Sequence, residues 1–187
     1  MSGMELPKQV LLTDSQCFGC SPHNPHGLRL VIEPHPEGMC ARFRLDRAFE
    51  SYPGIVHGGL TSLICDEVMG NLIVVHHRTS AFTVSMRQRF ISPLTVGRPY
   101  VCVARMDRDT DGHRLYHTSA DIVDADGTVC AMATATYQPF TLADVLGRDT
   151  ASEQKAAALS AAVPPHRDHT LPTGLLNGAD HDHADQH

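Results

Sequence analysis

The sequence predicts an α+β fold in which an antiparallel β-sheet wraps around one central α-helix. Several segments alternate apolar and polar residues as strands do, and short turn sequences join consecutive strands. One long run of residues is apolar enough for a helix that is buried on nearly all sides. Strands joined by hairpins pair antiparallel, and such a helix needs a concave sheet face to cover it.

The expected elements follow one another in the order β-β-α-β-β-β-β. A hairpin connection that contains Pro and Gly separates the first two strands, and an Asp126-Gly127 turn precedes the last one. The strands are expected at Leu28–Ile32, Met39–Leu45, Phe82–Ile91, Tyr100–Met106, Arg114–Val123 and Val129–Phe140, and the helix at Gly59–Val75.

Length and composition predict one domain with tails. The chain has 187 residues, of which 42% are hydrophobic, so it can bury one core. Its formal net charge of -6 disfavours nucleic-acid binding. We find neither a signal-peptide pattern nor an uninterrupted membrane-length apolar run, so a cytoplasmic location without membrane attachment is expected. Six scattered cysteines are typical of reduced core residues and not of a disulfide scaffold.

Four segments are expected along the chain. Residues 1–16 form a flexible N-terminal segment and residues 17–147 form the folded domain. Residues 148–163 form a peripheral Ala-rich helix, which begins with a capping-box spacing between Thr150 and Glu153 and ends before Pro164. Residues 164–187 form a disordered tail rich in His and Asp, which would catch metal ions only weakly.

The segment GIVHGGLTSLICDE, residues 54–67, holds the candidate chemistry. Gly58 and Gly59 allow a ligand to approach the backbone at a helix start, where the first amides are unpaired donors with partial positive charge. Such donors can polarise a thioester carbonyl and hold the developing oxyanion. Asp66 lies about two turns further along an otherwise apolar helix, where a carboxylate is costly unless it is paired or used.

These residues resemble the PaaI-like hotdog-fold acyl-CoA thioesterase family. His57-Gly58-Gly59, with Asp66 nine residues after the His, is similar to the signature of that family. Cys17-Phe18-Gly19-Cys20 followed by Asn24-Pro25-His26-Gly27-Leu28 is similar to the start of many members, and Ile91-Ser92-Pro93 resembles their post-strand turn. The resemblance covers residues 17–140 and implies a hotdog fold, in which a sheet wraps around the central helix.

The resemblance also implies the roles of individual residues. Asp66 is expected to be the catalytic carboxylate, Gly58 the oxyanion donor and His57 a neighbour that shapes the helix entry. Thr83 stands where relatives have a Ser or Thr that positions water or substrate. Ser51 stands where some relatives place an amide side chain, which leaves that substrate contact open.

Less specific interpretations stay open for several residues. Asp66 can be a solvated helix carboxylate, and His57 can act only near the N-cap or take a direct part in catalysis. The side chain of Glu67 points about 100° away from Asp66 and is expected to be structural or exposed. Cys65 fits core packing better than a nucleophile. The Cys17-x-x-Cys20 pair, with His23 or His26 nearby, suggests zinc but lacks a second pair of ligands, so no metal site is assigned.

Strand alternation predicts that Thr83, Ser85, Arg87 and Arg89 share one face of their strand. The two arginines would then lie about 13 and 20 Å from Thr83, which is comparable with the length of a pantetheine arm. They are therefore candidate contacts for the phosphates of coenzyme A, although two arginines on an exposed strand face are equally ordinary.

The expected reaction is hydrolysis of an acyl-CoA thioester without a cofactor or metal. Asp66 acts as base or nucleophile, the Gly58 N–H polarises the carbonyl, and Thr83 assists. A hotdog hydratase or dehydratase, and a non-catalytic acyl-thioester-binding protein, are the alternatives. Because Gly58 and Asp66 lie about 12 Å apart along the helix, one thioester carbon cannot contact both. A homodimer, or a tetramer built from two dimers, is therefore expected, with sites shared between antiparallel copies of the helix.

Overall fold

The structure is a computed structural model that describes residues 16–107 and 115–140. It contains one six-stranded antiparallel sheet with the strand order β1-β2-β4-β5-β6-β3, and one long helix, α1. The bounds are β1 Ile32–His35, β2 Gly38–Phe43, α1 Gly58–His77, β3 Ser80–Phe90, β4 Tyr100–Met106, β5 Tyr116–Asp124 and β6 Val129–Phe140, with a short 3₁₀ helix at Arg47–Phe49. The expected peripheral helix at 148–163 and the tail at 164–187 lie outside the described residues.

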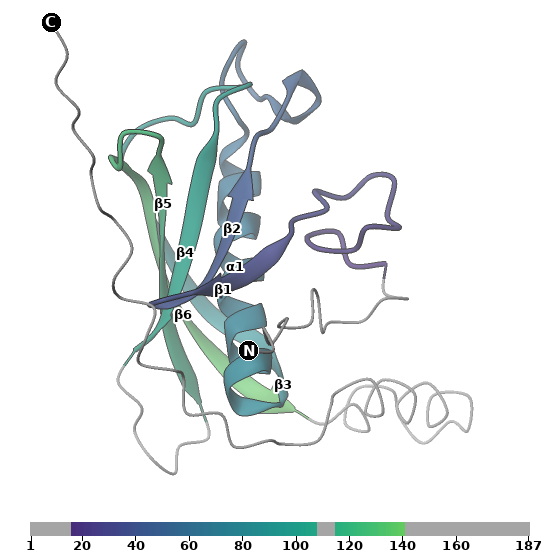
Figure 1. The fold of residues 1–187 in the computed structure, drawn as a ribbon, viewed down its shortest axis with the longest axis vertical. Coiled ribbons are helices and arrows are strands. Elements are labelled where there is room, and N and C mark those ends of the chain that lie inside the picture. The colour runs from purple at the N-terminus through teal and green to yellow at the C-terminus, as the bar shows by residue number, and fades with distance from the viewer. Residues whose placement is uncertain (1–15, 108–114, 141–187) are drawn as a thin grey trace, which may run out of the picture.

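Helix α1 runs along one face of the sheet (Figure 1) and contacts every strand from β2 to β6. It follows β2 in the chain, yet the next strand, β3, lies at the opposite edge beside β6. The connection through the helix therefore crosses the whole sheet. A helix covered by a curved antiparallel sheet is the arrangement of the hotdog fold, so the predicted fold class is confirmed.

The sheet face under the helix is built from small side chains. Ala104, Ala120 and Ala133 are register partners on β4, β5 and β6, and all three are buried. An alanine row leaves room for larger side chains of the helix, and Ile64, Val68, Met69 and Ile73 are fully buried against it. By length and composition α1 could cross a membrane, but these contacts make it the core helix of this fold.

The first strand lies later in the chain than expected. Residues 28–31 do not join the sheet, because the N–H groups of Leu28 and Leu30 donate to the carbonyls of Phe18 and Gly19 instead. Arg29 between them has a left-handed backbone (φ 51°), which interrupts an extended run. The expected connection residues Glu33, Pro34 and His35 instead belong to β1, whose position at the sheet edge tolerates a proline.

Candidate active site

The start of α1 has one capped amide and one free amide. His57 is the N-cap, and its Nδ1 accepts a hydrogen bond from the Gly59 N–H at 2.9 Å. A Cβ at Gly59 would lie 3.1 Å from that same ring atom, so the absence of a side chain lets the imidazole close over the backbone. Among the described residues the Gly58 N–H has no acceptor. Gly58 therefore has a free N–H donor at the start of the helix.

Asp66 is partly buried on α1 and is held by two hydroxyl groups. Its Oδ1 accepts from Thr83 Oγ1 at 2.7 Å and from Tyr137 Oη at 2.8 Å. Tyr137 Oη also lies 3.2 Å from the Asp66 carbonyl oxygen. In the described part of the chain no donor reaches Oδ2. One carboxylate oxygen is therefore fixed in place, and the other is free to bind water or substrate.

The register of the sheet brings the two hydroxyl groups together. Thr83 on β3 and Tyr137 on β6 are direct register partners, so their side chains leave the same face toward the helix. Burial and the charge of Asp66 raise the pKa of Tyr137, which keeps the phenol protonated as a hydrogen-bond donor. Tyr137 was not predicted as a site residue, because its place opposite Thr83 depends on a strand pairing that sequence spacing does not specify.

A β-bulge changes the face on which the arginines lie. The register of β3 against β6 shifts between Thr83 and Ser85, with Val84 as the extra residue. After the bulge the partly buried Met86 packs toward the core, whereas Arg87 and Arg89 are exposed. The prediction that Thr83 shares a face with the two arginines is therefore wrong, since the bulge moves every later residue to the opposite face.

Two further β3 residues lie between Asp66 and the helix start. Phe90 is close to Gly58, since a Cβ added to that glycine would lie 3.5 Å from the Phe90 ring. Gln88, two residues earlier, has a buried side-chain amide whose nitrogen and oxygen have no partner among the described residues. A buried amide without partners is costly, so Gln88 is a candidate substrate contact, although no local sequence pattern marks it.

Among the described residues neither Ser51 nor Cys65 forms a hydrogen bond with the Asp66 carboxylate. Ser51 is exposed in the turn before α1, where its N–H donates to the Ile55 carbonyl. Cys65 is completely buried in the core, as expected for packing.

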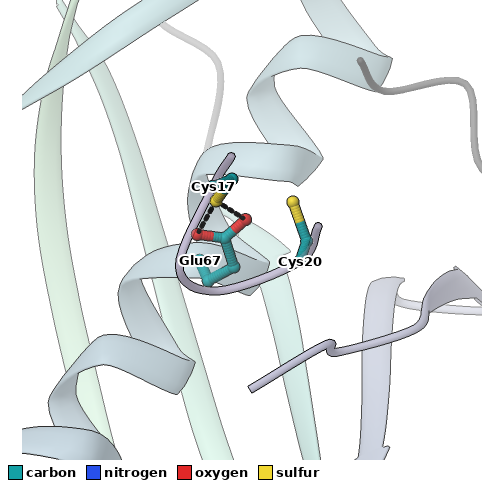
Figure 2. A group of neighbouring side chains, drawn as sticks. All are labelled: Cys17, Cys20 and Glu67. Atoms are coloured by element: carbon teal, nitrogen blue, oxygen red, sulfur yellow. Dashed lines mark hydrogen bonds between the residues drawn. The ribbon is translucent and has the colours of Figure 1, made fainter. Parts of the chain in front are cut away.

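Glu67 faces away from Asp66 toward the Cys17-x-x-Cys20 segment. Figure 2 shows both thiols beside its carboxylate, and Cys17 Sγ lies 3.4 and 3.5 Å from the two carboxylate oxygens. Burial raises the pKa of Glu67 to about 7. A hydrogen bond from Cys20 lowers the pKa of Cys17 to about 5. Glu67 is thus a structural partner, as expected, and its side-chain partners include the two cysteines and Asn71.

Residues 53–131 match the family model of the thioesterase superfamily. That range contains the helix start, Asp66 and Thr83. The resemblance to hotdog-fold thioesterases is thereby confirmed. No curated protein matches the chain.

Solved structures of thioesterase superfamily proteins have the same fold. Protein RHA08564, described as a thioesterase superfamily protein, is 23% identical with a TM-score of 0.59, and the match covers 66% of this chain and 60% of that one. The chain thus spans less than two thirds of that relative. The acetyl-CoA-bound smu.793 protein of Streptococcus mutans UA159 is 17% identical with a TM-score of 0.54, covering 59% and 88%.

A third structure bears on the PaaI-like resemblance. A putative thioesterase from Ralstonia eutropha JMP134, described as a phenylacetic acid degradation-related protein, is 24% identical with a TM-score of 0.52. The match covers 59% of this chain and 85% of that one. At these identities the structures establish the fold, and they are similar to this chain without defining its substrate.

The N-cap of α1 gives a test of the role of His57. His57→Ala should destabilise the protein by about 1 kcal/mol because the Gly59 N–H loses its acceptor, whereas His57→Asn should restore most of that loss, since Asn is a favourable N-cap. Chemical denaturation measures both changes. If the imidazole only caps the helix, turnover of His57→Asn stays near that of the parent. A large loss of turnover in His57→Asn at unchanged stability would instead assign His57 to the chemistry.

Proposed function

We propose that the protein hydrolyses acyl-CoA thioesters to a free acid and CoA, with Asp66 as the catalytic carboxylate. The observation that carries this proposal is the state of Asp66, whose Oδ1 is held by Thr83 and Tyr137 while Oδ2 has no donor among the described residues. The match to the thioesterase superfamily model and the CoA-bound structural neighbours support this reaction class. We also predict that the protein is cytoplasmic.

In this proposal Asp66 acts as general base. Its free Oδ2 takes a proton from a water molecule as the water oxygen attacks the thioester carbonyl carbon. The Gly58 N–H binds the carbonyl oxygen as negative charge develops on it. The C–S bond then breaks, and the CoA thiolate leaves with the proton that Asp66 had taken from the water, which restores the carboxylate. The two hydroxyl donors keep the carboxylate oriented, so the water is delivered along a fixed direction.

Asp66→Asn should lower the turnover number by roughly 10² to 10⁴ while the fold is retained. The amide oxygen of Asn can still accept from Thr83 and Tyr137, so the change removes the base and keeps the anchoring contacts. Release of free thiol from a panel of acyl-CoA esters measures the effect.

Asp124→Asn is the matched control for Asp66→Asn. Asp124 accepts two backbone N–H bonds in the turn between β5 and β6 and should keep parental turnover. Parental turnover in Asp66→Asn would disprove the mechanism. No thiol release by the parent protein from any ester would favour the hydratase or the binding protein. Single-turnover hydrolysis in heavy-oxygen water separates base from nucleophile, because only a nucleophilic Asp66 becomes labelled.

Two chains are needed for this arrangement. Within one chain Thr83, at one end of β3, lies at Asp66, and Phe90, at the other end, lies at Gly58. Asp66 and Gly58 are about 12 Å apart along α1. Among the described residues no strand pairs with the outer edge of β3, and the exposed apolar residues of β3 include Phe82 and Phe90.

An antiparallel pairing of two β3 strands brings the two halves together. A two-fold axis near Met86 and Arg87 would place Thr83 of one chain opposite Phe90 of the other. Asp66 of one chain and Gly58 of the other would then face the same thioester. We therefore propose a homodimer, alone or within a tetramer, with two shared sites. The pairing would also cover the unpaired β3 edges.

Co-expression of Gly58→Pro with Asp66→Asn tests the shared site. In a mixed dimer one site carries both changes and the other carries neither, so with random pairing about one quarter of all sites are intact and activity recovers to that order. Proline should be tolerated at this first helical position, because Gly58 does not have positive φ and His57 before it is already extended (φ -61°, ψ 128°).

Gly58→Ala is the matched control, since it keeps the amide donor and adds only a methyl group at ordinary contact distance from Phe90. It should retain activity that Gly58→Pro loses. Size-exclusion chromatography and two distinguishable tags verify that mixed dimers form. Verified mixed dimers that are no more active than either parent would show that each site belongs to a single chain.

Arg87 and Arg89 are the proposed contacts for the CoA phosphates. Both are exposed, and neither forms an ion pair within the described residues. They lie on the sheet face opposite Asp66, so the phosphates would have to pass around the end of β3 to reach them. Gln88 between them faces inward and is proposed to contact the pantetheine or acyl part.

The double change Arg87→Ala/Arg89→Ala should raise KM for an acyl-CoA about three- to tenfold with little effect on kcat, because exposed charge pairs each contribute about 1 kcal/mol or less. KM for the matching N-acetylcysteamine thioester, which has no phosphate, should not change. Arg44→Ala, an exposed arginine after β2, is the control. Equal increases in KM for both substrates would show that the two arginines do not bind the CoA phosphates.

A further inference from the structure

The side chains of Cys17, Cys20 and Glu67 form a compact cluster outside the proposed active site. Their sulfur and carboxylate oxygen atoms all lie within 4.8 Å of one another, and each residue is only partly buried. The two cysteines come from the segment before β1, and Glu67 comes from the middle of α1 (Figure 2). The fold therefore brings a pair of cysteines next to a carboxylate that lies 50 residues after Cys17 in the chain.

The separations fit those between ligands of one tetrahedral ion. Zinc lies about 2.3 Å from a cysteine sulfur and about 2.1 Å from a carboxylate oxygen, so sulfur and oxygen ligands of the same ion are about 3.6 Å apart. Cys17 Sγ is 3.4 Å from Glu67 Oε1 and 3.5 Å from Oε2. An ion can thus replace the thiol protons with small movements of the side chains.

The backbone between the cysteines is shaped around the Glu67 carboxylate. A Cβ at Gly19 would lie 2.3 Å from Glu67 Oε2, so no other residue type fits there without a shift of the loop or the carboxylate. Asn71, one turn along α1, donates from Nδ2 to Glu67 Oε1 at 3.0 Å and orients the carboxylate from behind. Such outer hydrogen bonds are typical of residues that hold a metal ligand in position.

The charges of the cluster also favour a cation. Within the described residues no Lys or Arg forms an ion pair with Glu67. Two thiols and a carboxylate become three negative groups when deprotonated, and thiolate ligands favour zinc over magnesium or calcium. We propose that Cys17, Cys20 and Glu67 bind one zinc ion, with water at the fourth position. Binding releases to solvent the protons that the thiols and the Glu67 carboxyl carry before the ion binds.

The proposed ion would fasten the N-terminal segment to the central helix. Residues 16–31 contain no helix or strand, and their backbone hydrogen bonds join them to one another in turns and loops. A metal that binds the folded state stabilises it by mass action. Glu67 directly follows Asp66, so the same ion would also stabilise the helix turn that carries the proposed catalytic carboxylate. This site does not depend on the proposed hydrolase activity.

The test uses the full chain, fully reduced, freed of metal by a chelator and titrated with Co²⁺ as a spectroscopic probe. We expect one bound cobalt ion per chain with a thiolate-to-cobalt charge-transfer band, which Zn²⁺ abolishes by displacement. The His-rich tail has no cysteine, so it cannot produce this band. Cys20→Ser should remove most of the band, and Glu67→Gln should weaken binding at least tenfold.

Two further variants serve as a control and as a second test of the Glu67 ligand. Cys130→Ser changes a buried cysteine on β6 and should leave the titration unchanged. Gly19→Ala keeps all three ligands but adds a Cβ that collides with Glu67, so it should also weaken cobalt binding. It replaces Glu67→Gln as the test if that variant does not fold.

Three results would overturn the proposal. The first is a reduced protein that gives no thiolate band. The second is a band of undiminished intensity in Cys20→Ser. The third is equal cobalt affinity in the parent, Glu67→Gln and Gly19→Ala. A chain that forms a Cys17–Cys20 disulfide but takes up no cobalt when reduced would replace the metal site with a redox pair.

Discussion

The close approach of α1 to the sheet is the constraint on which the rest of the structure depends. It is possible because Ala104, Ala120 and Ala133 form a row of buried methyl groups across three neighbouring strands. Larger residues in that row would overpack the core and move the helix outward. A helix at greater distance would lose the short bonds from Asp66 to Thr83 and Tyr137, because those hydroxyls are fixed by the sheet. Core packing thus sets the position of the carboxylate.

Two adjacent carboxylates on this helix have different surroundings because of helical geometry. Successive residues point about 100° apart, so Asp66 faces β3 and β6 whereas Glu67 faces the segment that contains Cys17 and Cys20. Asp66 is held by hydroxyl donors and keeps one oxygen free. Burial raises the pKa of Glu67 to about 7, and its neighbours are ligand-type sulfur atoms. One turn of α1 therefore carries both the candidate catalytic group and the candidate metal ligand, and they face different parts of the molecule.

Local pattern predicted most of the fold, and it failed where distant segments meet. The long apolar run and the later strands were found at nearly their observed bounds, since their periodicity is a property of the chain itself. The bulge at Val84, the pairing of Tyr137 with Thr83, and the contact of Glu67 with Cys17 all depend on register or on packing between segments. The glycines and Asp66 were recognisable as a motif, but the partners of Asp66 were not, because no local signal marks a residue that lies across the sheet.

The position of the candidate site at β3 links its chemistry to assembly. An edge strand with unpaired backbone groups and exposed aromatic side chains is a liability that proteins usually cover. Here that strand also carries Thr83, the unsatisfied amide of Gln88 and the ring of Phe90 beside Gly58. Covering the edge with a second copy would shield the apolar side chains and complete the set of groups around the thioester. The same pairing that makes the chain safe from uncontrolled association would therefore make it active, and a substitution at the β3 edge should act on both properties together.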